Sequence, residues 1–283
     1  MQFVLPTFAK LNLTLRVTGR RPDGYHDIVS TFLRIPSGEE LWATPEPRGV
    51  GGDLIQIRDL DLDIPCENTV AKALRLAREA GSDVPWLWIE IRKSLHPGSG
   101  LGAGSGNAAA VLQWLAAWNT TLPWMDVARR TGADVPFLFS GLPMALVTGT
   151  GDCIEPLPPI HLRGVVVLPE WEVGTSGAYE ALDAALNGKY PMDETQAREE
   201  ADRILTALDV GERVGLLPND FAPPLIKAHP QYEELFGLFE DMDALAWGIT
   251  GSGSAAFAIL RGRCDEPKWP GWVRQVLSLP PQP

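Results

Sequence analysis

Hydrophobic and polar residues alternate near the start of the chain. The apolar positions are Leu11, Leu13, Leu15 and Val17, and the polar ones between them are Lys10, Asn12, Thr14 and Arg16. A period of two predicts a β-strand with one buried face. Lys10, Asn12 and Thr14 then share the opposite face, which is either solvated, the commoner outcome, or directed into a binding cleft.

A period of three to four residues predicts helices further along the chain. Asn68 is a suitable N-cap for the first of them, and Gly81 a suitable stop. The predicted helices are 68–80, a segment around 108–115, 124–130, 176–186, 194–208 and 231–245. Strands are expected at 86–91 and 165–168 and within a β-rich stretch over 28–64. The small residues of 249–258 predict a turn that leads into either a strand or a helix. From Arg261 onward, we expect a short proline-rich tail.

The length and the prolines set the expected domain organisation. A chain of 283 residues fits one large domain or two modest ones. Pro156, Pro158 and Pro159 mark a joint between two domains, 1–157 and 158–283. The hydrophobic content of 45% and the charged content of 21% are typical of a globular protein.

The net charge of −12 argues against nucleic acid as a partner, because phosphate backbones need clustered Lys and Arg. A single nucleotide is still compatible, since it needs only local donors and usually brings a metal cation. Three scattered cysteines without metal spacing, Cys66, Cys153 and Cys264, favour a reducing compartment. Without a secretory signal or an apolar run near 18 residues, we expect a cytoplasmic protein and no membrane partner.

Five glycines, at 98, 100, 102, 104 and 106, precede the helix predicted around 108–115. A glycine-rich loop lets the backbone approach a ligand closely, and the helix N-terminus that follows attracts anions such as phosphate. No lysine follows the last glycine, so this is not a P-loop. The dinucleotide-binding pattern needs a preceding strand and an acidic residue about 20 positions later. The strand expected at 86–91 precedes the loop, and although position 127 is Val, the nearby Asp126 leaves this alternative open. The alternative is a flexible surface loop before an ordinary helix.

For two further stretches, the sequence is compatible with a structural role and with a role in catalysis or binding. Asp134, in the stretch 132–137, is either the N-cap of a helix with Pro136 in its first turn or a catalytic carboxylate. Tyr25 and His26 follow a Pro-Asp-Gly turn, and such a pair is more often part of the packing than of a reaction.

Three stretches in this order resemble the GHMP superfamily of small-molecule kinases. They are the strand with Lys10, the loop PGSGLGAGSGNAA (97–109) and the late TGSGSAAFA (250–258). Within the superfamily, the chain is most similar to the family of 4-diphosphocytidyl-2-C-methyl-D-erythritol kinases. The residues that carry this closer resemblance are 9–13, 19–26, 132–137, 148–152, Thr175, Tyr179 and 219–220. The region 28–44, Gly106 in place of a common serine, and the short tail depart from the family pattern.

The resemblance implies an α+β, two-domain GHMP kinase fold with the active site in the cleft between the domains. It implies a kinase that transfers the γ-phosphoryl group of ATP to the 2-hydroxyl of the erythritol moiety, in the non-mevalonate route to isoprenoids. Asp134 would be the general base and Lys10 its partner. No protein ligand for Mg²⁺ is evident, so water and phosphate oxygens would complete its shell.

The resemblance also assigns the remaining site residues. Asn68 would lie near the nucleoside of ATP, and the loop Pro97, Gly98, Ser99, Gly100, Leu101, Gly102, Ala103, Gly104, Ser105, Gly106 and Asn107 would hold its phosphates. Tyr25 and Tyr179 would stack on the cytosine of the second substrate while His26 binds its polar edge. Asn12 and Thr175 would contact the erythritol or the diphosphate, and Gly251–Ser254 would shape the cleft by close backbone approach.

Three other functions compete with this one. Another GHMP kinase, acting on homoserine, mevalonate or a sugar, would have no base for Tyr25 and His26 to contact. A non-catalytic nucleotide-binding relative would not need Lys10, Asp134 and the glycine loop together. A nicotinamide-dependent oxidoreductase lacks the fitting acidic partner after the glycines. The partner is thus expected to be a cytidine diphosphate-linked small molecule, bound by a monomer or homodimer.

Overall fold

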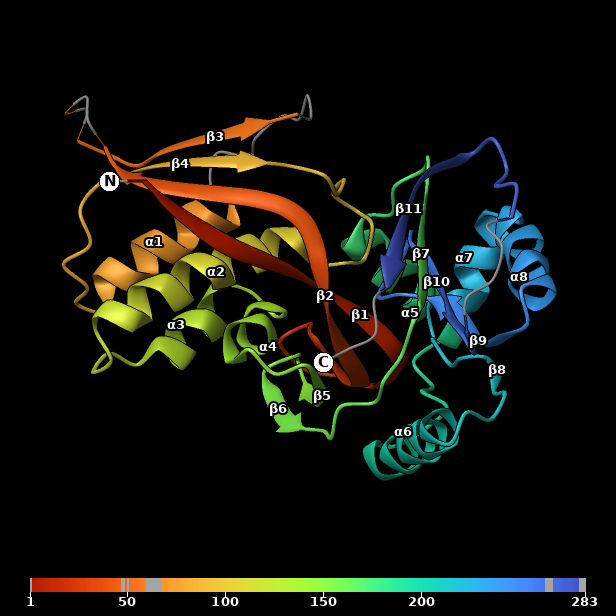
Figure 1. Cartoon of the computed structure of the whole chain (residues 1–283). Coiled ribbons are helices and arrows are strands. Elements are labelled where there is room, and N and C mark those ends of the chain that lie inside the picture. The colour runs from red at the N-terminus through yellow and green to blue at the C-terminus, as the bar shows by residue number, and fades with distance from the viewer. Residues whose placement is uncertain (1, 47–48, 50, 60–67, 263–266, 280–283) are drawn as a thin grey trace. The chain divides into compact units, whose positions relative to one another are not determined.

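The structure is a computed structural model, and it describes all residues except 1, 47–48, 50, 60–67, 263–266 and 280–283 (Figure 1). Contacts divide the chain into two compact units. Unit 1 comprises Met1–Lys10, Arg34–Pro97 and Gly102–Leu142, and unit 2 comprises Leu11–Leu33, Gly98–Leu101 and Pro143–Pro283. Compact units of this kind are not the same as independently folding domains, so the expected domain boundary after residue 157 stays a prediction. Cys66 and Cys264 lie outside the described residues, whereas Cys153 is a free, exposed thiol.

Two long strands begin the fold. β1 (Phe3–Arg20) and β2 (His26–Pro45) pair with each other, and each contributes residues to both units. The alternating pattern predicted β1 correctly but showed only its second half. The tight turn between the strands closes when Gly24 N–H donates to the Arg21 carbonyl, and Gly24 has a φ of 89° that favours glycine.

In unit 1, four helices pack against one side of the strands (Figure 1). β3 (Leu54–Arg58) runs parallel to β4 (Leu87–Arg92), and β4 pairs antiparallel with residues 40–45 of β2. The helices are α1 (Thr69–Glu79), α2 (Ala103–Trp118), α3 (Trp124–Thr131) and α4 (Val135–Ser140). Strand residues such as Leu41 and Ile89 and helix residues such as Leu74, Leu112 and Phe137 are fully buried between them.

The ends of the unit 1 helices follow the local sequence. Asn68 caps α1, because its side-chain oxygen accepts from Ala71 N–H at 2.8 Å, and Gly81 stops the helix with a φ of 96°. Both features confirm the prediction. α2 starts earlier than predicted, inside the glycine loop, because small residues add no apolar periodicity that would reveal a helix turn.

Unit 2 is built around an antiparallel sheet with one parallel edge pair. Its strand order is β11-β7-β10-β9-β8, with β7 (Gly164–Pro169), β8 (Gly215–Leu216), β9 (Ala244–Ile249), β10 (Ala256–Leu260) and β11 (Val273–Leu279). β5 (Met144–Gly149) pairs with residues 28–33 of β2 and with β6 (Cys153–Pro156). The helices are α5 (Thr175–Leu186), α6 (Glu194–Asp209), α7 (Ala222–Ala228) and α8 (Gln231–Asp241).

Two expectations for unit 2 were wrong. The predicted helix 231–245 ends at Asp241, and residues 244–249 form β9 instead. All six residues of β9 are buried, and a short apolar run of this kind does not distinguish a strand from a helix by periodicity. The proline-rich tail contains a strand, β11, which pairs with β7.

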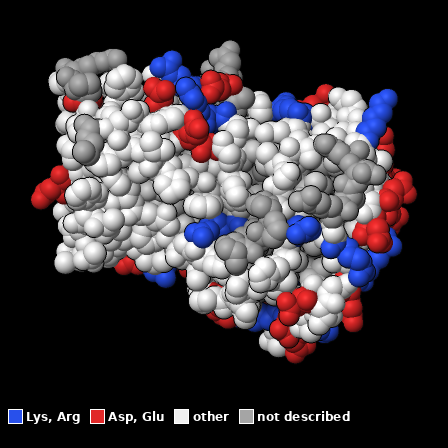
Figure 2. Space-filling model, viewed as in Figure 1, with Lys and Arg blue, Asp and Glu red and all other residues white. Residues whose placement is uncertain are grey.

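Charges on the surface are mixed in sign. On the face seen in Figure 2, basic side chains lie beside acidic ones, and exposed ion pairs such as Arg92–Glu40 (3.4 Å) and Arg198–Glu155 (2.6 Å) are examples of the arrangement. None of the helices in the described part of the chain has the length and apolar character needed to cross a membrane.

The tight packing of α2 on β1 gives a first prediction. A Cβ added to Gly106 would collide with the carbonyl oxygen of Phe8, whereas one added to Gly104 would meet only Thr69 Oγ1, at 3.6 Å. We expect Gly106→Ala to lower the free energy of unfolding by about 2 kcal/mol or more. The matched control Gly104→Ala should be neutral or stabilising by up to about 1 kcal/mol. Urea unfolding measures both, and equal stabilities would contradict the packing described.

Candidate functional site

The first half of the glycine loop, in unit 2, lies on a turn that is far away in the sequence. Ser254 N–H donates to the Gly98 carbonyl at 2.9 Å, and Ala255 N–H donates to the Ser99 carbonyl at 3.0 Å. A Cβ at Gly100 would collide with the Thr250 carbonyl oxygen, and the φ of Gly100 is 76°. The close backbone approach expected of Gly251–Ser254 is therefore observed, and its partner is the loop itself.

The second half of the loop, in unit 1, lies against the two residues predicted to be catalytic. A Cβ at Gly102 would stand 2.9 Å from Asp134 Oδ2 and 3.3 Å from Lys10 Cγ. Lys10 Nζ and Asp134 Oδ2 are 3.9 Å apart. The structure thus brings together Lys10, Asp134 and the loop residue Gly102, which are separated by up to 124 positions in the chain, from 10 to 134.

Asp134 occupies the N-cap position of α4, but its carboxylate does not cap the helix. An N-cap aspartate normally accepts a hydrogen bond from the second or third N–H of the helix. No such bond is present here, and the first turn contains Pro136, which has no N–H to donate. The carboxylate instead faces Lys10, with 27% of its side chain exposed. This position favours the interpretation of Asp134 as a catalytic carboxylate over its interpretation as a helix N-cap.

Lys10 is a buried cation, with 7% of its side chain exposed. Burial lowers the pKa of Lys10 because the charged ammonium loses water, while the charge of Asp134 acts in the opposite direction. A lysine whose pKa is lowered by folding costs stability at any pH where it is charged. A buried lysine beside a carboxylate is therefore a feature that folding alone does not favour.

The N-terminus of α2 has features that suit a phosphate ligand. The N-cap Gly102 has a φ of 64° and no side chain, so no capping hydrogen bond closes the first turn of the helix. The side chain of Thr69, next to the predicted nucleoside contact Asn68, lies near Gly104. Asn68 itself caps α1. The first turn of α2, which includes Ser105, and the start of α1 therefore lie close together.

Behind the loop lies a buried polar cluster that the sequence did not reveal. Glu39, whose side chain is fully buried, accepts from Lys93 Nζ at 2.7 Å and from Asn107 Nδ2 at 2.8 Å. The Asn107 Oδ1 atom is buried and has no hydrogen-bond partner among the described residues. An unpaired buried acceptor next to the loop is a group that a bound ligand or water could satisfy. The alternation of residues could have revealed Glu39. It lies an even number of positions from Ile35 and Leu41, so its side chain is on the same buried face of β2 as theirs.

In unit 2, two of the predicted substrate residues, Asn12 and Thr175, lie beside the turn 250–254. Asn12 N–H donates to Thr250 Oγ1 at 2.8 Å, and the Asn12 side chain donates to Ser30 Oγ at 2.8 Å. Ser252 Oγ donates to Thr175 Oγ1 at 3.4 Å. Asn12 and Thr175 therefore both lie beside one turn.

The aromatic residues predicted to bind cytosine are only partly together. Tyr179 stacks on His26, with ring centroids 4.5 Å apart, and His26 Nε2 lies 2.8 Å from Asp183 Oδ1. Tyr25 has 66% of its surface exposed. The structure thus pairs Tyr179 with His26 and leaves Tyr25 at the surface, next to His26 in the chain.

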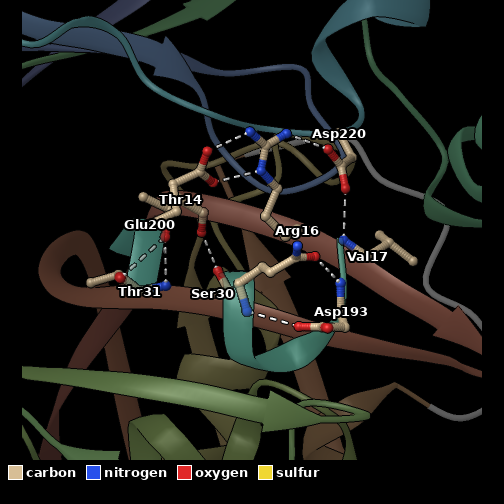
Figure 3. A network of polar contacts seen from close by, with 9 residues as sticks. Thr14, Arg16, Val17, Ser30, Thr31, Asp193, Glu200 and Asp220 are labelled. Carbon is tan, nitrogen blue, oxygen red and sulfur yellow. Dashed lines mark hydrogen bonds and ion pairs between the residues drawn. The ribbon is translucent and has the colours of Figure 1, made fainter. Parts of the chain in front are cut away.

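An ion-pair network anchors β1 within unit 2 (Figure 3). Arg16 binds both carboxylate oxygens of Glu200, at 2.7 and 2.8 Å, and Asp220 Oδ1 at 2.6 Å. Asp220 Oδ2 also accepts from Val17 N–H at 2.8 Å. The neighbouring Asn219 donates to the carbonyls of Ile249 and Gly251, so the network extends to the turn 250–254.

A pocket of about 630 Å³ is lined by the polar residues Arg16, Glu200, Arg203, Arg213 and Asn219 and by apolar residues of α6, of α7 and of the segment 214–218. None of the predicted site residues lines it. Across the described residues, no group of three His, Cys, Asp or Glu side chains is placed to hold a metal ion.

The chain is similar to known kinases over most of its length. Residues 68–141 match the GHMP kinases N terminal domain. The chain is 34% identical, over 92% of its length and 89% of the relative, to the 4-diphosphocytidyl-2-C-methyl-D-erythritol kinase of Solidesulfovibrio magneticus. The chain belongs to this family of kinases. The Salinibacter ruber member is 33% identical, over 89% of this chain and 87% of its own.

Two solved structures share the fold of the chain, and one of them is a member of the same kinase family. The crystal structure of a 4-(cytidine 5'-diphospho)-2C-methyl-D-erythritol kinase covers 93% of this chain and 91% of its own, with a TM-score of 0.72 and 30% identity. A homoserine kinase from Cytophaga hutchinsonii has a TM-score of 0.64 at 18% identity, over 91% of this chain and 84% of its own. The expected α+β GHMP kinase fold is confirmed.

The network around Arg16 gives a second prediction. Asp220→Ala would leave the buried Val17 N–H and one side of the part-buried Arg16 guanidinium without a partner. We expect this substitution to lower the free energy of unfolding by about 2–4 kcal/mol. The control Glu79→Ala removes exposed ion pairs with Arg75 and Arg130 and should cost less than about 1 kcal/mol. Denaturant unfolding measures both, and a loss below 1 kcal/mol for Asp220→Ala would mean that the network does not stabilise unit 2.

Proposed function

We propose that the protein transfers the γ-phosphoryl group of ATP to the 2-hydroxyl of 4-diphosphocytidyl-2-C-methyl-D-erythritol. The observation that supports this most directly is the contact between Lys10, Asp134 and Gly102 in unit 1. A buried cation, a carboxylate without a capping role and a glycine that leaves room beside both are the parts that phosphoryl transfer to an alcohol needs. Membership of the kinase family supplies the reaction and the substrate.

Asp134 acts as the general base that accepts the proton of the 2-hydroxyl as the oxygen attacks phosphorus. A positioned base contributes about 10²–10⁴-fold to the rate. Lys10, 3.9 Å away, orients the hydroxyl and offsets the charge that develops on the transferred group. Gly102 has no Cβ, which would lie close to both side chains, and its positive φ favours glycine at this position.

ATP is the co-substrate, and its phosphates bind to the loop 97–107 through backbone N–H groups at the start of α2. The first turn of α2, where no side chain accepts from the helix N–H groups, fits an anion at this place. Ser105 provides the hydroxyl for a phosphate oxygen or its Mg²⁺, and Asn68 lies toward the nucleoside. Mg²⁺, when bound, neutralises phosphate charge, and water and phosphate oxygens complete its coordination.

The cytidine end of the second substrate binds in unit 2. Tyr25 and Tyr179 provide aromatic faces, and His26 binds the polar edge of the base. Asn12 and Thr175 bind the diphosphate or the erythritol, beside the turn 250–254 that both of them contact. An active site in a cleft between two domains, a cytoplasmic location and a monomeric or homodimeric state stay predictions.

Another GHMP kinase activity is the alternative function, and the shared fold of homoserine kinase is the reason to test it. The pair Tyr25–His26 speaks against it, because a homoserine or mevalonate substrate has no base. A non-catalytic nucleotide-binding protein is disfavoured by the burial of Lys10 opposite Asp134. A buried charge costs stability, and a protein without a reaction to catalyse would have no use for it.

The role of Asp134 gives a third prediction. Asp134→Asn keeps the size of the side chain but removes its ability to accept a proton. We expect kcat to fall by about 10²–10⁴-fold, with little change in the Kd for ATP. The control Asp126→Asn changes an exposed carboxylate on α3 and should keep both values. Steady-state kinetics with ATP titration measures the difference, and near-normal turnover of Asp134→Asn would remove the base assignment.

Substrate choice gives a fourth prediction. ADP release, measured by a coupled assay with ATP and Mg²⁺, should require the cytidine-bearing substrate and should stay at background with homoserine, mevalonate or galactose. A stacking base and a diphosphate contribute binding energy that the small alcohols cannot provide. ADP release with one of these three and none with the cytidine-bearing alcohol would replace the proposed function by the alternative.

A further inference from the structure

The pocket of about 630 Å³ in unit 2 shares no residue with the proposed phosphoryl-transfer and substrate sites. Its walls come from α6, from the segment 214–218 that contains β8, and from α7 (Figure 1). Arg16, Arg203 and Arg213 line it, and Glu200 is the one acidic residue among the described residues that do so. We call it the arginine pocket. Small-molecule sites occupy about 300–1,000 Å³, so the arginine pocket is large enough for a ligand of its own.

The charges that line the arginine pocket do not cancel. Each nitrogen of the Arg16 guanidinium has an acceptor: Nε and Nη2 bind the two carboxylate oxygens of Glu200, and Nη1 binds Asp220 (Figure 3). Both oxygens of Glu200 are thereby occupied by Arg16. Within the part of the chain that the structure describes, neither Arg203 nor Arg213 forms an ion pair with an acidic side chain. Two exposed positive charges at this pocket are therefore without a counter-charge.

Arg203 and Arg213 reach the arginine pocket from different elements. Arg203 is on α6, and Arg213 precedes β8, with its guanidinium 5.5 Å from the ring centroid of Trp247. A guanidinium that lies on an aromatic face keeps its N–H edge for another partner. Arginine is always charged in proteins, so an anion in the pocket would offset the repulsion between the two groups. The planar N–H fork of arginine suits the oxygens of a phosphate or a carboxylate.

The remaining wall of the arginine pocket is apolar. Among its residues are Ile204, Ala207, Val214, Leu216, Pro223 and Ile226. Leu216 has 49% of its surface exposed, although removal of a leucine side chain from water is favourable. An inorganic anion would leave this wall in contact with water. The ligand that fits best therefore carries an apolar group as well as a negative charge.

We propose that the arginine pocket is a second binding site, for a small amphiphilic anion: a phosphate or carboxylate that carries a short apolar group. Its anionic end pairs with Arg203 and Arg213, and its apolar end packs on Leu216 and Ile226. ATP and cytidine phosphates fit less well, because their polar base and ribose would lose water against an apolar wall. The proposal goes beyond the phosphoryl transfer, since no residue assigned to that reaction lines the arginine pocket.

The first test is a calorimetric titration of the full chain with hexyl phosphate. A non-hydrolysable ATP analogue and CDP are present at saturation, so that the proposed substrate sites are already occupied. We expect one site per chain with a Kd of about 0.1–1 mM. Inorganic phosphate lacks the tail and hexanol lacks the charge, so each should bind about tenfold more weakly or worse. A parallel titration with heptanoate shows whether the preferred anion is a phosphate ester or a carboxylate.

The second test removes the two charges. We expect the double substitution Arg203→Gln and Arg213→Gln to weaken hexyl phosphate binding by about tenfold or more and to leave hexanol binding unchanged. The matched control is Arg198→Gln, on the same helix. Arg198 pairs with Glu155 and Glu194 and does not line the arginine pocket, so the affinity should stay within about twofold.

A third variant tests the apolar wall and leaves both arginines in place. Ala207→Phe puts a ring into the space that the alkyl chain would occupy, and we expect hexyl phosphate binding to fall by about tenfold or more. Urea unfolding shows whether each variant is folded. If Ala207→Phe does not fold, the double arginine variant still decides, because its two side chains are exposed and their loss leaves the core intact.

Three results would overturn the proposal: no binding of hexyl phosphate at about 10 mM, binding no tighter than that of hexanol, or unchanged affinity in the double arginine variant. None of these measurements uses the rate of phosphoryl transfer. A chain that bound hexyl phosphate as expected but phosphorylated no alcohol would refute only the proposed function. A chain that phosphorylated the cytidine-bearing alcohol but did not bind hexyl phosphate would refute only the inference about the arginine pocket.

Discussion

The structure depends on backbone contacts that only glycine permits. At Gly100 a side chain would collide with the turn 250–253, and at Gly106 it would collide with β1. At Gly102 it would press on Lys10 and Asp134. Three positions of one loop, 100, 102 and 106, are therefore restricted to glycine by three different neighbours. These contacts fix where α2 begins, and they keep open the space next to the carboxylate and the ammonium.

Carboxylates that each receive several donors hold the polar parts of the protein in place. Glu39 binds Lys93, Asn107 and the Leu95 N–H, and Asp220 binds Arg16 and the Val17 N–H. Asp183 binds His26, Tyr190 and Arg20. A carboxylate with two or more hydrogen bonds is restrained in direction as well as in position. Residues such as Asn107 and His26 are thereby oriented before any ligand arrives, which reduces the ordering that binding requires.

Lys10 and Asp134 differ from these groups. Their charged atoms are 3.9 Å apart, longer than a direct hydrogen bond, and burial lowers the pKa of Lys10. An arrangement selected for stability alone would bring the two charges into contact or replace them with apolar residues. The remaining gap leaves room for an alcohol oxygen between a base and a cation, and this fits the proposed phosphoryl transfer.

The sequence by itself determined the elements with clear periods and caps. It gave the strand around Lys10, the helix capped by Asn68 and stopped by Gly81, and the GHMP kinase fold through its motifs, and it named Lys10, Asp134 and the loop as a site. It did not show the strands at 244–249 and 273–279, because short apolar runs have no distinctive period and strand pairing depends on distant partners. Tertiary structure alone decided that Asp134 faces Lys10 rather than its own helix, and that His26 meets Asp183. These contacts join residues more than a hundred positions apart, and no local pattern of residues encodes which distant side chain a polar group will meet.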